Sequence, residues 1–174
     1  MDKKMIYRLT SKMAKRIKES SLPNIEHSAN SYLDWAADVF VANRVHYILL
    51  THCRSLLSCV ASARAINNSA AFIEWCNEII WDTLLYYDYE FIFRSHVAPE
   101  MGKIAFSKVA SRKVNGVMVD LVKHAKYYLS VDELSPHELA QRLNQIPQCK
   151  QEQPWPVEAF AKLQINRTEG SNQS

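Results

Sequence analysis

The chain has 174 residues, of which 48% are hydrophobic and 22% charged, and its formal net charge is +3. This composition excludes a mainly disordered chain, and the lack of any run of about 18 apolar residues excludes a membrane-spanning helix. A chain of this length buries about 70% of the surface that its unfolded form exposes, which predicts a single domain over residues 1–166.

The first part of the chain predicts a strand, a basic helix and a β-hairpin. Residues 5–9 alternate as in a half-buried strand, and a Thr-Ser pair then caps a helix whose exposed face is basic. Two runs of β-favouring residues, 35–41 and 45–51, predict an antiparallel hairpin with a short turn between them. Trp35 begins the first run, and we expect so large an aromatic side chain to face the core.

The middle of the chain predicts a third strand and a long helix. The strand is expected at 56–61, and the helix at 69–88 has a broad apolar face. Two large residues of this helix, Trp81 and Leu85, fall on its polar face, so another part of the structure should cover them. Ordinary intramolecular packing favours the segment 155–163 as the cover, and a partner chain is the alternative.

The last part of the chain predicts a second unit of strand and helix, followed by a short helix. Residues 103–109 alternate as in a strand, and Ser111 caps a helix at 112–129. A capping box starts the short helix at 136–146, prolines break the chain beyond it, and residues 167–174 predict a flexible tail. Together these elements predict an α+β fold, in which a small, mainly antiparallel sheet packs against several helices.

Three stretches of the chain, residues 5–18, 34–52 and 111–129, resemble a bacterial family of uncharacterised proteins. The positions that carry the resemblance are Trp35, Arg44, Arg112, Gly116, Met118 and Asp120. Asn115 and Val119 depart from the family pattern, which has an aliphatic residue and an asparagine at these two positions. The family has no assigned activity, so the resemblance implies a fold and marks positions but implies no reaction.

Basic residues concentrate in two segments of the chain. Residues 1–20 contain seven Lys or Arg against two acidic residues, and residues 103–126 contain six against one, so each segment carries +5. If their strands are neighbours in one sheet, the two basic helices should lie side by side and form one surface that attracts phosphates. The predicted contacts to nucleic acid or another polyanion are Lys12, Lys15, Arg16, Lys108, Arg112, Lys113 and Lys123.

The plain alternative is that these residues are only the solvated faces of amphipathic helices, which keep their lysines in water in most soluble proteins. The start of the second basic helix is the sharper candidate, because free backbone amides and the positive end of the helix dipole meet Lys108, Arg112 and Lys113 there. No helix-turn-helix, zinc-finger or RNA-recognition signature supports the nucleic-acid reading.

A polar stripe on the same helix is the one candidate for chemistry. Arg112, Gly116, Asp120 and His124 recur at four-residue spacing, and Asp120 or His124 would act as the acid or base while Arg112 holds an anion. No nucleophile with a partner base is recognisable, and three glycines are too few for a nucleotide-binding loop. The sequence therefore favours a binding role over an enzyme and predicts no catalytic residue and no cofactor.

The cysteines and the amino terminus indicate the compartment. Cys53, Cys59, Cys76 and Cys149 lie far apart and form no CxxC pair, which predicts reduced thiols and no zinc site. Basic residues occupy the positions where a signal peptide needs its apolar stretch, so we expect a cytoplasmic protein.

Two functions remain open at this point. The first is contact with nucleic acid or another polyanion through the two basic helices. The second is a protein-interaction module, such as an accessory or defence component, that docks through Trp81, Leu85 and the carboxy-terminal aromatic segment. Salt-dependent retention of nucleic acid would favour the first, and a co-purified protein would favour the second.

Overall fold

The computed structural model describes the backbone of residues 3–171 and the side chains of residues 3–163. Five strands form one sheet in the order β4-β3-β2-β1-β5. The strands are β1 (Met5–Leu9), β2 (Asp34–Ala42), β3 (Val45–His52), β4 (Ser58–Ser62) and β5 (Ile104–Lys108). The alternation of apolar residues therefore located all five strands to within two residues.

The sheet is mixed, and the expectation of a mainly antiparallel sheet is wrong. Strand β1 pairs in parallel with both of its neighbours, β2 and β5, whereas β3 pairs antiparallel with β2 and β4. Parallel neighbours need a long crossover connection, usually one that contains a helix. The connection from β1 to β2 contains a helix, and the chain between β1 and β5 contains the other three strands and further helices. The domain remains α+β.

The helices begin where the capping residues predict. They are α1 (Ser11–Arg16), α2 (Ser69–Tyr86), α3 (Glu90–Ile92), the π-helical turn η1 (Phe93–Val97), the 3₁₀ turn η2 (Ala98–Glu100), α4 (Arg112–Val131), α5 (Pro136–Asn144) and α6 (Pro156–Ser171). The side-chain oxygens of Thr10, Asn68, Ser111 and Ser135 accept hydrogen bonds from the first turns of α1, α2, α4 and α5. Within the described residues, no helix has both the length and the apolar character that crossing a bilayer requires.

Helix α6 differs from the expectation, because the prolines around its start predict a break in the chain. Pro156 is the first residue of the helix, where the missing N–H of proline removes no intrahelical hydrogen bond. Phe160 of this helix is buried against Tyr32 and Trp35, so tertiary packing holds it. The helix includes the first residues of the predicted tail at 167–174, and residues 172–174 lie outside the described part of the chain.

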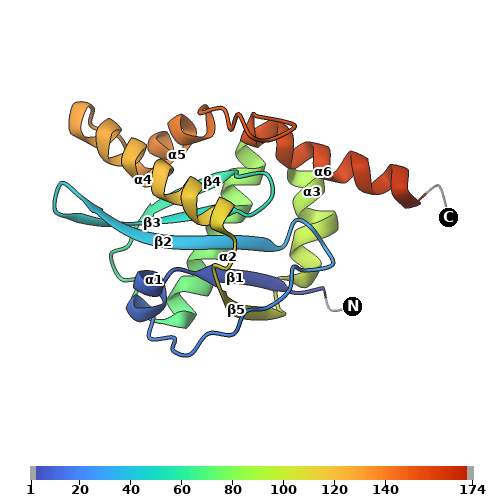
Figure 1. The fold of residues 1–174 in the computed structure, drawn as a ribbon, viewed down its shortest axis with the longest axis horizontal. Helices are drawn as coiled ribbons and strands as arrows, with labels where there is room; N and C mark the ends of the chain where they lie inside the picture. Colours follow the sequence, from blue (N-terminus) through green and yellow to red (C-terminus); the bar gives the residue numbers. More distant parts are fainter. Residues whose placement is uncertain (1–2, 172–174) are drawn as a thin grey trace.

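The sheet separates two hydrophobic cores. The first core contains the buried residues of α1 and α2 together with Tyr7 and Trp35 of the sheet, and the second contains those of α4 and α5 together with Ala36 and Phe40. Trp35 and Ala36 are successive residues of β2 and so point to opposite faces. Figure 1 shows the consequence, with α1 on one side of the sheet and α4 on the other.

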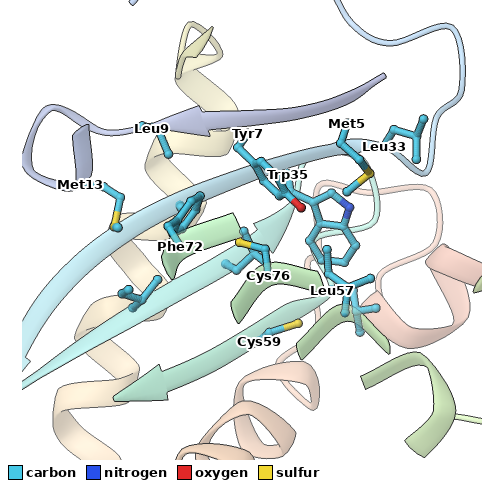
Figure 2. Close-up of a cluster of buried hydrophobic side chains, with 14 of the residues drawn as sticks. Met5, Tyr7, Leu9, Met13, Leu33, Trp35, Leu57, Cys59, Phe72 and Cys76 are labelled. Carbon is cyan, nitrogen blue, oxygen red and sulfur yellow. The ribbon is translucent and has the colours of Figure 1, made fainter. Parts of the chain in front are cut away.

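Trp35 is fully buried in the first core, as the hairpin pattern predicts. Its indole Nε1 donates a hydrogen bond of 3.0 Å to the carbonyl oxygen of Tyr32, and its ring meets the edge of the His52 ring at 5.0 Å. Figure 2 shows the indole among the apolar side chains of this cluster, which include Tyr7 of β1 and Leu57 of the turn before β4. The buried N–H is therefore satisfied, and the ring is enclosed by side chains.

The buried His52 ring predicts that the fold loses stability in acid. Burial lowers the pKa of His52 from 6.5 to about 4, and both ring nitrogens are engaged in the neutral form. Nδ1 accepts the N–H of Ser55, which leaves Nε2 to donate to the carbonyl oxygen of Ser31 at 2.8 Å. The unfolded chain takes up a proton below pH 6.5, whereas the folded chain does so only near pH 4.

The free energy of unfolding should therefore decrease by about 3 kcal/mol between pH 6.5 and pH 4 on account of this one residue. Urea denaturation at several pH values measures the change, and His52→Gln should flatten this part of the profile. His46 is exposed and serves as the control. The variant His46→Gln should leave the dependence of stability on pH unchanged. A profile that is the same with and without His52 would contradict the assignment.

The four cysteines are free thiols. Cys53, Cys59 and Cys76 are buried, and Cys149 is exposed. Burial raises the pKa of Cys53 and of Cys59 to about 12, so both thiols stay protonated and act as small apolar side chains.

Candidate anion-binding site

The parallel strands β1 and β5 end side by side, and the helices that follow them leave in opposite directions. Leu9, the last residue of β1, pairs with Lys108, the last residue of β5. Helix α1 follows β1 onto the face of the first core, and α4 follows β5 onto the face of the second (Figure 1). A crevice outside the carboxyl ends of parallel strands, where the connections diverge to the two faces, is the usual ligand site of α/β sheets.

A cavity of about 760 Å³ lies at this point, and we call it the first cavity. Three cationic side chains line it: Lys15 from α1, Lys108 from the end of β5 and Arg112 from the start of α4. Glu19 is the acidic residue of the lining, and its carboxylate accepts a hydrogen bond from Ser69. Among the residues that the structure describes, none forms an ion pair with these three cations.

The first turn of α4 adds backbone groups to this cavity. Ser111, which also lines it, accepts a hydrogen bond from the N–H of Val114 through its side chain. The other N–H groups at the start of a helix have no acceptor within the helix, and the dipole of a 20-residue helix places partial positive charge there. The site thus combines three cationic side chains with the positive end of a helix.

The predicted continuous basic surface does not exist, because α1 and α4 cover opposite faces of the sheet. Lys12 lies 3.9 Å from the carboxylate of Asp38, and Arg16 donates hydrogen bonds to two backbone carbonyl oxygens. Lys113 donates to Gln151, and Lys123 is exposed farther along α4. Only the ends of the helices nearest the strands meet, so the structure gathers part of the predicted set and separates the rest.

A second, smaller cavity of about 320 Å³ adjoins the first. The two cavities share Val109, Ala110 and Ser111, which connect β5 to α4. The second cavity is also lined by Arg8 of β1 and by His27 of the loop before β2. Neither residue belongs to the site that the sequence predicts.

Arg8 and Asp34 form a buried ion pair beside the second cavity. Nε and Nη2 of Arg8 lie 3.0 and 2.9 Å from Oδ1 of Asp34, and Nη1 donates to the carbonyl oxygen of Ile25 and to Oγ of Ser107. The alternation at 5–9 predicts a half-buried strand, and this is wrong because helices cover both faces of the sheet. The signal for the pair is an arginine within an otherwise apolar strand, although its partner cannot be read from the pattern.

The other oxygen of Asp34 faces the loop. Oδ2 accepts the backbone N–H of Ser28 at 2.8 Å and lies 3.2 Å from Nδ1 of His27. The Asp34 side chain is fully buried, whereas 55% of the His27 side chain is exposed. A fixed carboxylate therefore orients an accessible imidazole.

The polar stripe of α4 does not form a site of its own. Arg112 lines the first cavity, but Gly116, Asp120 and His124 follow it along an exposed face, and Nδ1 of His124 contacts the carbonyl oxygen of Asp120. A Cβ atom built on Gly116 would meet no atom within 4 Å, so close packing does not require this glycine. Among the described residues, no three His, Cys, Asp or Glu side chains are grouped as metal ligands would be.

Trp81 of the alternative docking surface is covered in a way that the sequence does not predict. Trp81 lies 4.8 Å from the Phe93 ring, and the Arg94 guanidinium lies over its indole at 5.3 Å. The cover is therefore the turn after α3, and the expected cover, the segment at 155–163, packs into the first core instead. Leu85 remains 44% exposed.

The comparisons with known proteins identify the family. Neither the curated proteins nor the solved structures contain a significant match. A family model described as a domain of unknown function, DUF6933, matches residues 6–159. This range includes the whole sheet and both cavities apart from β1's first residue. The chain therefore belongs to the DUF6933 family.

Proposed function

We propose that this protein binds nucleic acid, or another polyanion, by holding phosphate groups in the first cavity. The observation that supports the proposal is that Lys15, Lys108 and Arg112, from three different elements, line one cavity and form no ion pair with any described residue. Unpaired cations repel one another, and a phosphate would remove that repulsion. The contact would use charge and the first turn of α4, so it would be largely independent of base sequence.

The proposal narrows the expected contact from two helix faces to the crevice between them. Lys123 follows Arg112 by eleven residues, which places it about 16 Å farther along the α4 axis. Such a residue would contribute only if a long strand of nucleic acid continued along the helix. Lys15, Lys108 and Arg112 would supply most of the binding energy.

Fluorescence anisotropy with labelled single-stranded RNA and DNA tests this proposal. Three neutralised phosphates predict that affinity decreases by roughly 2 log units per log unit of salt, or about twentyfold between 50 and 200 mM. The variant Lys15→Glu/Lys108→Glu/Arg112→Glu should lose binding at 50 mM salt. Competition with heparin shows whether another polyanion occupies the same site.

A matched control has the same change in charge at exposed lysines outside the cavity. Lys103→Glu/Lys123→Glu/Lys126→Glu alters the residue before β5 and two residues of α4, and none of the three lines the first cavity. This control should retain most of the affinity. Equal losses in the two triple variants would indicate nonspecific attraction to net charge, and the absence of any binding at low salt would refute the proposal.

A further inference from the structure

We propose that the chain cleaves RNA at the second cavity, with His27 as the general base and Asp34 as its positioning residue. This inference rests on the proposed function, because it requires the RNA phosphates to be held in the adjoining first cavity. The two cavities share the wall formed by residues 109–111, so a strand anchored in one would place a neighbouring nucleotide in the other.

The arrangement of Asp34 and His27 is that of an acid–imidazole dyad. Nδ1 of His27 lies 3.2 Å from Oδ2 of Asp34, so the neutral ring would donate its N–H to this carboxylate and leave Nε2 free to accept a proton. The Asp34 carboxylate is held at both oxygens, since Arg8 contacts Oδ1 and the backbone N–H of Ser28 donates to Oδ2. His27 lines the cavity with much of its side chain exposed, as a residue that meets substrate must be.

The nucleophile would come from the substrate. Cys53 also lines the second cavity, but it is buried, and burial raises the pKa of its thiol to about 12, so it carries no thiolate. Ser111 uses its side-chain oxygen to cap α4. RNA brings its own nucleophile, the 2′-hydroxyl, and needs from the protein a base and nearby positive charge.

The step balances without a co-reactant. Nε2 of His27 takes the proton of the 2′-hydroxyl while the 2′-oxygen bonds to the adjacent phosphorus. The bond from phosphorus to the 5′-oxygen breaks, and this oxygen takes a proton from water. The products are a 2′,3′-cyclic phosphate and a free 5′-hydroxyl, and His27 returns its proton to the solvent. Lys108 and Arg112, which flank the shared wall in the sequence and line the first cavity, would stabilise the charge on the phosphate oxygens.

The test compares a labelled RNA oligonucleotide with the same sequence carrying a 2′-O-methyl group on every ribose. The protein should cut the first into fragments that end in a 2′,3′-cyclic phosphate and leave the second intact. His27→Gln should slow cleavage by about 100-fold or more while its affinity for the uncut 2′-O-methyl strand changes less than twofold. Added imidazole should restore part of the activity of His27→Ala, which a purely structural role of His27 would not allow.

The control is His124→Gln, since His124 is exposed on α4 and lies outside both cavities. It should cut RNA at the wild-type rate. Cleavage that persists in His27→Gln, or cleavage of the 2′-O-methyl strand, would overturn the inference. Binding of RNA without cleavage would overturn this inference alone, whereas a lack of binding would overturn the proposed function as well.

Discussion

Trp35→Ala is expected to lower the free energy of unfolding by about 3–5 kcal/mol. The side chain has no exposed surface, and its removal leaves a cavity that Tyr7, His52 and Phe160 line from three elements. These neighbours belong to β1, β3 and α6, so they cannot collapse together into the space. The carbonyl oxygen of Tyr32 also loses the hydrogen bond that the indole donates.

The shift of the urea midpoint, followed by circular dichroism, measures this loss. Trp155→Ala is the matched control, because Trp155 is exposed and its loss should cost well under about 1 kcal/mol. An unchanged midpoint for Trp35→Ala would show that the first core is not built around this residue.

Asp34→Ala is expected to cost about 3–5 kcal/mol, because it leaves the Arg8 guanidinium buried without its counter-ion. The physical cause is the desolvation of a charge, so removing the charge as well should relieve much of the loss. The double variant Arg8→Leu/Asp34→Ala is therefore expected to be more stable than Asp34→Ala. A gain in stability on adding the second substitution distinguishes an unpaired charge from a simple loss of packing.

The exposed pair of Arg142 and Asp132, at 2.7 Å, is the control for this experiment. Asp132→Ala should cost less than about 1 kcal/mol, since water solvates the arginine that it leaves behind. Equal losses for Asp34→Ala and Asp132→Ala would show that Arg8 is not desolvated. A double variant less stable than Asp34→Ala would assign the loss to packing.

Local sequence determined most of the elements of this protein. The caps Thr10, Ser111 and Ser135 mark helix starts because each side chain bonds to backbone only three residues away. Alternation of apolar residues marks the strands, since side chains of a strand point to alternate faces. The resemblance of three stretches to a family of uncharacterised proteins agrees with the match to DUF6933.

The predicted basic surface is not continuous, although three of its seven residues line one cavity. Lys15, Lys108 and Arg112 meet in one cavity because β1 and β5 pair in parallel, so that their carboxyl ends lie side by side. The basic faces of α1 and α4 do not meet, because the face that a helix covers depends on the direction of its connection. A helix with one apolar side carries no information about which face of the sheet will bury it.

The residues that the sequence did not reveal are those that depend on contacts between distant segments. Arg8 and Asp34 are 26 positions apart, and their pairing follows from the parallel register of β1 and β2. His27 lies in an irregular loop, where no periodic pattern predicts the direction of a side chain. The sequence by itself determined the strands, the helices that begin at a capping residue and the basic segments, because these follow from contacts within a few residues. Only the tertiary structure decided the parallel pairing, the two faces and the dyad beside the crevice, because these depend on how segments far apart in the chain close around the two cores.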